Sequence, residues 1–156
     1  MGINDVRVPD EHPLMQIIYQ FIEAYNSYDT TGLLALHTDD AIWTWIDPGR
    51  NVRQWGPEGK AVGVGKQEIL KMFEEDRGEG GYTGWILFSE LQGNDLSTIE
   101  MWQSDLTRTF GLPLVTKSLY RFRGTRIVEW TWVVSPEITA RLAEAVIKAT
   151  SEPKSA

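Results

Sequence analysis

The sequence of 156 residues contains no cysteine, which excludes disulfide bonds, thiolate nucleophiles and thiolate metal sites. Histidine is scarce as well, since only His12 and His37 are present. Neither histidine stands at a spacing from acidic residues that is typical of a metal site. We therefore expect a protein that works with no metal ion and no other cofactor.

Positive charge is also scarce, and the formal net charge is −7 at pH 7. Nucleic acids and anionic membranes bind basic faces or basic amphipathic helices, and the sequence predicts neither. No segment approaches the 18 apolar residues of a membrane span, and the charged first 13 residues do not resemble a secretory signal. We expect a soluble, cytoplasmic protein without a nucleic-acid or membrane partner.

Tryptophan, in contrast, is abundant, with seven residues that fall mostly in segments with a strand pattern. The length fits one domain with one core. We predict a flexible arm over residues 1–11, a single domain over residues 12–150 and a frayed tail over residues 151–156. So many tryptophans in a sheet indicate either a cavity walled by aromatic rings or a large apolar core.

The first half of the chain shows the helical period of apolar residues in three places. This period predicts three helices. The first covers residues 12–26, the second runs from a cap at Asp29 or Thr30 to His37, and the third covers residues 66–75. A strand over residues 41–46 follows the second helix, and a long irregular connection with a short ribbon at residues 52–55 leads to the third. The acidic end of the third helix and the glycine-rich residues 76–81 are expected to be solvated.

The second half alternates between strand patterns and turn signals. Strands are predicted over residues 82–91, 97–110, 114–122 and 126–134, and their short connections indicate an antiparallel meander. Ser135, Pro136 and Glu137 are typical of a helix start, which predicts a last helix to about Thr150. Helices first and strands afterwards predict an α+β fold with the helices on one face of the sheet.

Several local phrases resemble one known superfamily. They are FIEAYN at residues 21–26, LLALHTDDA at 33–41, GKQEI at 65–69, and the YRF and RIVEW pair at 120–122 and 126–130. Over residues 14–134 the chain resembles the NTF2-like superfamily, in its ketosteroid-isomerase and SnoaL-like polyketide-cyclase branch. The resemblance implies a cone-shaped, cystatin-like fold: a curved antiparallel sheet, N-terminal helices on its concave face and a C-terminal helix.

The resemblance also shows which chemistry is missing. Phe21 and Ser118 stand where the steroid isomerases have the tyrosine and the late aspartate of an oxyanion hole. Trp45 stands at the position of their base, two residues before Asp47. The last-strand acid of epoxide hydrolases of this fold aligns with Trp132. The chain therefore matches neither catalytic pattern.

Residues two apart share one face of a strand, so the inward-facing side chains can be assigned. With the faces oriented by the resemblance, the expected lining consists of Phe21 and Tyr25 on the first helix, Trp43 and Trp45, Ser118 and Tyr120, and Trp130 and Trp132. Such a lining suits a flat hydrophobic ligand. The alternative is that the tryptophans simply fill the cone.

Three ionisable residues are candidates for catalysis. Asp47 meets apolar walls at a strand end and could act as a base, or it accepts backbone hydrogen bonds in a turn. Asp105 shares a strand face with Met101, so it faces the ligand, unless a bulge turns it to the surface near Arg108; Glu100 has the opposite parity. His37 could shuttle a proton, or it packs at a helix end.

These residues predict an enzyme of the isomerase, cyclase or dehydratase (lyase) type that needs no cofactor. Acid–base catalysis would act on a hydrophobic polyketide-, terpenoid- or steroid-like substrate, with Asp47 as first choice for the base and Tyr25, Ser118 and Tyr120 as hydrogen-bond donors. The alternative is a non-catalytic ligand-binding or dimerisation module of the same fold. Outward residues such as Lys117, Glu129 and Thr131 fit a homodimer through the outer sheet face.

Overall fold

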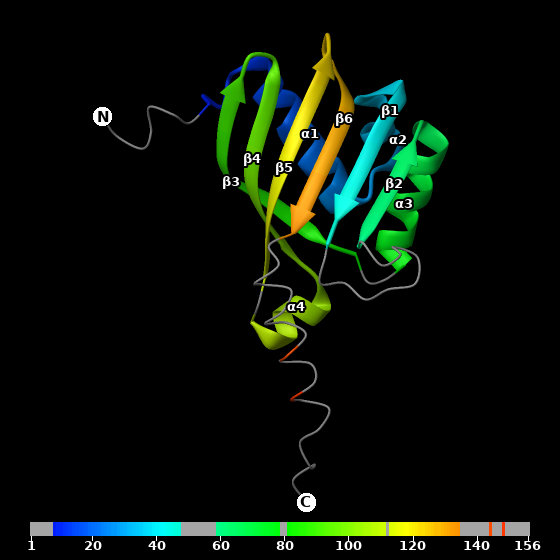
Figure 1. Ribbon diagram of the computed structural model, residues 1–156, viewed down its shortest axis with the longest axis vertical. Helices are drawn as coiled ribbons and strands as arrows, with labels where there is room; N and C mark the ends of the chain where they lie inside the picture. The colour runs from blue at the N-terminus through cyan, green and yellow to red at the C-terminus, as the bar shows by residue number, and fades with distance from the viewer. Residues whose placement is uncertain are drawn as a thin grey trace, which may run out of the picture.

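The computed structural model describes residues 8–47, 59–78, 81–111 and 113–134, together with the helical positions Glu144 and Lys148. The elements are α1 (Pro13–Ser27), α2 (Thr30–Ala35), β1 (His37–Ile46), β2 (Lys60–Val64), α3 (Lys66–Gly78), β3 (Thr83–Gln92), β4 (Asp95–Gln103), α4 (Asp105–Phe110), β5 (Leu114–Arg123) and β6 (Arg126–Val134). Figure 1 shows one sheet with α1, α2 and α3 behind it, which confirms the α+β class. No helix among the described residues is long and apolar enough to cross a membrane.

The sheet has six strands in the order β2-β1-β6-β5-β4-β3. Strands β3, β4, β5 and β6 pair antiparallel in chain order, as the short connections predicted, and β1 pairs antiparallel with β2. The first strand, however, pairs with the last in parallel, with Trp43 opposite Trp130 and Trp45 opposite Trp132. The prediction of a fully antiparallel sheet is therefore wrong, and the sheet is mixed. Strands β1 and β6 are neighbours in the sheet but are not joined by a short turn, so no turn requires them to run antiparallel.

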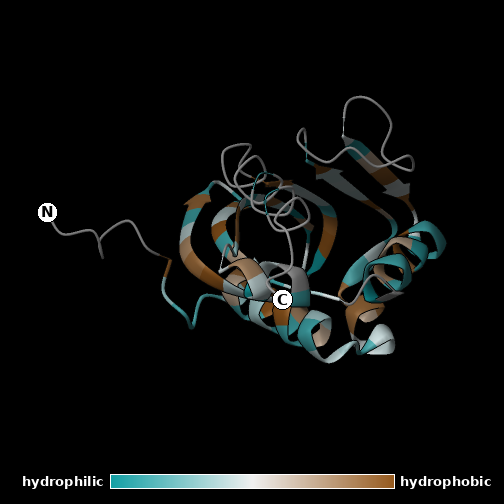
Figure 2. Cartoon of the chain, turned by 90° about the horizontal axis from the view of Figure 1, so that it is seen from below, coloured by the Kyte–Doolittle hydropathy of each residue, from teal (hydrophilic) through white to brown (hydrophobic). Residues whose placement is uncertain are grey.

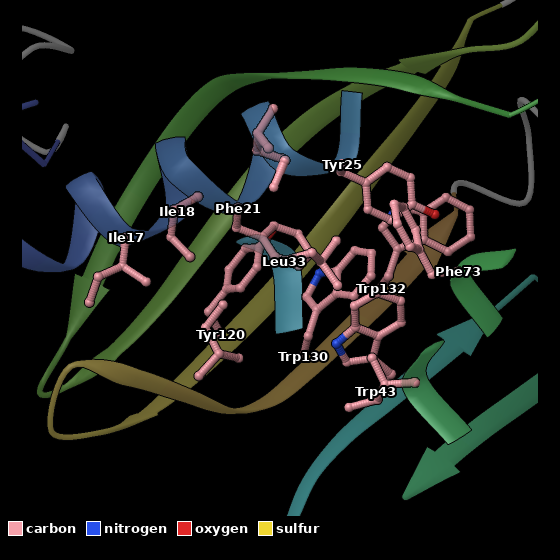
Figure 3. Close-up of a cluster of buried hydrophobic side chains, with 14 of the residues drawn as sticks. Ile17, Ile18, Phe21, Tyr25, Leu33, Trp43, Phe73, Tyr120, Trp130 and Trp132 are labelled. Atoms are coloured by element: carbon pink, nitrogen blue, oxygen red, sulfur yellow. The ribbon is translucent and has the colours of Figure 1, made fainter. Parts of the chain in front are cut away.

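Helix α1 supplies the other layer of the core. Pro13 occupies its first turn, and the His12 ring caps it by accepting a hydrogen bond from the Leu14 N–H. Figure 2 shows the sheet curving around the helices. The Phe21 ring lies 5.0 Å from Trp130 and 5.7 Å from Tyr120, both edge-on. Aromatic side chains therefore form the core between helix and sheet (Figure 3).

Three predicted elements differ from the structure. The strand expected over residues 97–110 ends at Gln103, because Ser104 and Thr107 form a capping box that starts α4. His37 begins β1 instead of ending α2. Residues 60–64, expected to be irregular, form the edge strand β2.

Helix α3 is longer than predicted and runs through Asp76 to Gly78. The expected ribbon at residues 52–55 lies outside the described residues. The same is true of the expected last helix, of which only Glu144 and Lys148 are described. The extension of α3 matters most, because it carries Asp76 into the interior.

Candidate functional site

A cavity of about 20 Å³ lies at the end of the cone where β1 and β6 finish. Its lining combines four tryptophans with two tyrosines and one acid: Trp45, Trp102, Trp130, Trp132, Tyr25, Tyr82 and Asp76. Figure 3 shows Tyr25, Trp130 and Trp132 converging from α1 and β6. The walls are therefore aromatic, and the single carboxylate among them comes from α3.

Tyr25 and Asp76 form the polar pair of this cavity. The Tyr25 hydroxyl donates a hydrogen bond to Oδ2 of Asp76 at 2.6 Å. Both residues are buried, with 3% and 7% of their surface exposed. Burial, followed by the neighbouring Asp76 charge, raises the pKa of Tyr25 well above 10, so its hydroxyl keeps its proton and acts as a donor.

The sequence contains a signal that places Asp76 in the interior. Ile69, Met72 and Phe73 form the buried stripe of α3, and Asp76 follows four residues after Met72 and three after Phe73. The acidic run was expected to be solvated, yet Glu74 and Glu75 alone are exposed. Helical period, continued through the charged residues, places Asp76 on the buried face.

Behind the cavity lies a second buried acid, Glu100 on β4, whose carboxylate receives four hydrogen bonds. Thr98 and Tyr120 donate to Oε2 at 2.6 and 2.5 Å. Trp102 and Ser118 donate to Oε1 at 3.0 and 2.9 Å. Strand parity placed Glu100 and Asp105 on opposite faces of the predicted strand. Of these two acids, Glu100 is the one whose side chain points inward.

The directions of these bonds follow from the donors. The Trp130 indole can only donate, and it donates to the Ser118 hydroxyl at 3.0 Å, so Ser118 gives its own hydrogen to Glu100. Trp102 also can only donate. Glu100 thus anchors two of the four tryptophans that wall the cavity. Burial raises the pKa of Glu100, although its four donors act in the opposite direction.

The two acids predicted to act in catalysis, Asp47 and Asp105, lie in different environments. Asp47 is buried, two residues beyond Trp45 on the same strand face, and its backbone N–H donates to the Gly59 carbonyl at 2.7 Å. Asp105 was expected on a strand but begins helix α4, where its side chain is 89% exposed and pairs with Arg108 at 3.3 Å. Of the two positions predicted for Asp105, the surface position near Arg108 is confirmed and the interior one is wrong, because the capping box ends the strand before it.

His37 is fully buried and uses both ring nitrogens within the core. Because the Trp43 indole donates to its Nε2 at 2.9 Å, the ring carries its hydrogen on Nδ1 and donates to the Leu33 carbonyl at 2.8 Å. Burial lowers its pKa to about 4. The ring is neutral near pH 7 and does not line the cavity.

The predicted lining residues divide into two groups. Tyr25, Trp45, Trp130 and Trp132 line the cavity. Phe21, Trp43, Ser118 and Tyr120 face inward, as strand parity and the resemblance together predicted, but they do not line the cavity. Phe21 and Trp43 pack behind its wall, and Ser118 and Tyr120 donate hydrogen bonds to Glu100. Within the described residues no cluster of histidine and acids is suited to a metal ion.

Solved structures place this architecture among known folds. An epoxide hydrolase from M. tuberculosis aligns at a TM-score of 0.63 and 14% identity, over 91% of this chain and 98% of that one. A candidate polyketide cyclase from Sinorhizobium meliloti aligns at 0.60 and 17%, over 85% and 99%. An NTF2-like protein of unknown function from Burkholderia pseudomallei aligns at 0.63 and 16%, over 84% and 97%.

The chain has the NTF2-like fold. No family model matches the sequence, and no curated protein matches it. Structures of this NTF2-like fold include proteins described as cyclases, isomerases and an epoxide hydrolase. At such low identity the likeness shows the fold alone, so the function of this NTF2-like chain has to be argued from its own cavity.

Proposed function

We propose that this chain is an enzyme that needs no cofactor and transfers a proton on a small hydrophobic molecule, with Asp76 as the base. The observation that carries the proposal is the 2.6 Å hydrogen bond from Tyr25 to Asp76 at the wall of an aromatic cavity. A catalytic base works when a neighbour holds its orientation and a substrate proton comes within hydrogen-bond reach. Tyr25 fulfils the first of these conditions.

The residues around this pair have distinct roles in the proposal. Tyr25 keeps its proton and fixes the plane of the Asp76 carboxylate through Oδ2. The tryptophan walls stack on flat apolar groups and exclude water from the reacting atoms. Proton transfer by one positioned group contributes roughly 100- to 10,000-fold to a rate.

Asp47 supplies a second carboxylate toward the end of the cone. It follows Trp45 on the same strand face and is 5% exposed. Two carboxylates whose surroundings differ can divide the work of acid and base between them. Because the cavity measures about 20 Å³, the body of a substrate lies outside it or requires a rotamer change in a wall residue such as Trp45.

Proton abstraction can be tested without knowledge of the natural substrate. The protein is incubated in D2O with a panel of flat hydrophobic ketones, and NMR follows deuterium entering beside the carbonyl. We expect a rate above that of buffer, and a loss of at least about 100-fold in Asp76→Asn. The matched control is Asp105→Asn, an exposed acid that should leave the rate unchanged. Equal rates for the wild type and Asp76→Asn contradict the proposal.

A second candidate function is a non-catalytic ligand-binding module of the same fold. The small size of the cavity favours it, because buried apolar side chains fill most of the space between the helices and the sheet and leave little room for a reacting substrate. This candidate predicts that hydrophobic ligands quench tryptophan fluorescence equally in the wild type and Asp76→Asn, with no deuterium exchange in either. The enzyme, in contrast, predicts deuterium exchange in the wild type that is lost in Asp76→Asn.

The predicted homodimer through the outer sheet face is retained as a proposal. In Figure 1 that face is turned to the viewer, opposite α1, α2 and α3. Its side chains include the charged Lys117 and the half-buried Glu129, Thr131 and Val133. Size-exclusion chromatography with light scattering measures the molar mass and distinguishes one chain from two. A mass of about 17.7 kDa, that of one chain, contradicts the dimer.

A further inference from the structure

The indole N–H of Trp132 differs from those of three other inward-facing tryptophans, Trp43, Trp102 and Trp130. Trp43, Trp102 and Trp130 donate to His37, Glu100 and Ser118 at 2.9, 3.0 and 3.0 Å. The indole N–H of Trp132 is buried and has no hydrogen-bond partner among the described residues. Burying a donor without an acceptor destabilises a protein, so native proteins satisfy such groups with a ligand or ordered water.

Trp132 is 8% exposed, and it lines the same cavity as Asp76 and Tyr25. A cavity needs about 10–15 Å³ to hold one oxygen atom with its hydrogens, and this one measures about 20 Å³. Its size therefore selects a single small polar group. Larger parts of a ligand would have to lie outside it.

The two polar walls select the chemistry of that group. The Trp132 indole can only donate, so the group must accept a hydrogen bond. The Asp76 carboxylate is an acceptor, so the group must also donate one. A hydroxyl does both, whereas a carboxylate would meet the Asp76 charge and an ammonium group cannot accept from Trp132.

We propose that this cavity is a binding site for one hydroxyl, either a water molecule or the hydroxyl of a substrate, held between Trp132 and Asp76. The inference rests on the proposed function for the role of Asp76 as base, and it narrows the reaction to one that removes or adds water. Trp132 acts as the donor to the oxygen that leaves or attacks.

In the removal of water the bonds and protons balance within the site. Asp76 takes the proton from the carbon next to the one that bears the hydroxyl, and the electrons of that C–H bond form the double bond. The C–O bond breaks with its electron pair on oxygen, where the Trp132 N–H stabilises the charge. The leaving oxygen takes the proton from Asp76 and departs as water, and the reverse sequence adds water.

The indole resonance of Trp132 reports on the site directly. NMR of the nitrogen-15 labelled protein detects transfer of magnetisation between bound water and indole hydrogens, and Trp132→Phe assigns the peak. We expect a cross-peak with water at Trp132 and none at Trp102, whose N–H is bonded to Glu100. The thermal midpoint of Trp132→Phe shows that the variant is folded.

Benzyl alcohol and toluene distinguish the two sources of the hydroxyl. If a substrate hydroxyl binds here, benzyl alcohol shifts the Trp132 peak and removes its cross-peak with water, and toluene does neither. If water is the occupant, the cross-peak persists with both. A Trp132 peak without a water cross-peak that also ignores the alcohol overturns the inference, as does an equal shift with toluene. These readouts involve no turnover, so they can succeed or fail independently of deuterium exchange.

Discussion

Tyr120 on β5 and Glu100 on the neighbouring β4 share a hydrogen bond of 2.5 Å between fully buried side chains. Burial and the adjacent carboxylate raise the pKa of Tyr120 well above 10, so the phenol is the donor near neutral pH. Glu100 also accepts hydrogen bonds from Thr98, Trp102 and Ser118. One carboxyl group therefore links β4 to β5 and holds Trp102 in the cavity wall. The wall is therefore built on a buried carboxyl group, and substitutions of Glu100 test its contribution to stability.

Replacing Glu100 by alanine should destabilise the protein severely. It leaves four buried donors without an acceptor, and each costs roughly 1–3 kcal/mol, so we expect a loss of about 4 kcal/mol or more in the free energy of unfolding. Glu100→Gln keeps one carbonyl oxygen and should cost about half as much. Urea denaturation measures both. A loss below about 1 kcal/mol in Glu100→Ala contradicts this account of the network.

The same residue gives a pH dependence of defined sign. Its pKa is raised in the folded protein from an ordinary value of 4.5, so the folded state holds the proton more tightly than the unfolded chain. The resulting stability is fully present below pH 4.5 and is lost as the pH rises through the folded pKa. The advantage of the wild type over Glu100→Gln should therefore shrink as the pH rises. An advantage that grows would show that the four donors outweigh burial.

His37 should produce the opposite dependence. Its pKa falls from 6.5 to about 4 in the folded protein, so the unfolded chain takes up the proton first. The stability from the neutral ring is present above pH 6.5 and is lost toward pH 4, by about 3 kcal/mol in the limit. Denaturation at pH 7 and pH 4 should show this slope in the wild type and lose it in His37→Gln. An unchanged slope in the variant would assign acid sensitivity to other groups.

The Tyr25–Asp76 hydrogen bond should be worth about 1.5–3 kcal/mol, because its acceptor is a carboxylate. A double-mutant cycle of Tyr25→Phe and Asp76→Asn isolates this coupling from the other contacts of each residue. The exposed Asp105→Asn serves as the control and should change stability by less than about 0.5 kcal/mol. Additive effects of the two substitutions would mean that the hydrogen bond contributes nothing.

Gly84 should tolerate no side chain, because a Cβ atom there would lie 2.5 Å from the Trp102 ring. Asn26 holds the same glycine by donating to its carbonyl at 2.9 Å and accepting from its N–H at 2.8 Å, so the backbone cannot easily retreat. We expect Gly84→Ala to cost about 2 kcal/mol and to alter the near-ultraviolet circular dichroism of Trp102. Glu90→Ala, at an exposed position of the same strand, should change neither.

Periodicity, together with the resemblance to the NTF2-like fold, predicted much of this molecule. Alternation along the strands showed which residues share a face, and the resemblance assigned the face of Trp45, Ser118 and Trp132 to the interior. Helical period located α1 and the start of α3. The α+β class followed from the order of the elements.

The remaining features depend on choices that periodicity does not record. Asp105 left its strand because Ser104 and Thr107 cap a helix, a local preference that outweighed the strand pattern. Asp76 is buried because α3 continues past a run of acids, and its partner Tyr25 lies 51 residues away. The parallel pairing of β1 with β6 has no signal within either strand, since it is decided by how the whole sheet closes.

That pairing also has a consequence for synthesis. Strand β1 forms near the start of the chain, yet its hydrogen-bonded neighbour β6 ends at Val134. During synthesis, about 90 further residues must therefore be added after Trp43 and Trp45 before their partners Trp130 and Trp132 are present. During that interval an aromatic strand lacks its partner, and unpaired apolar strands of this kind are prone to aggregate.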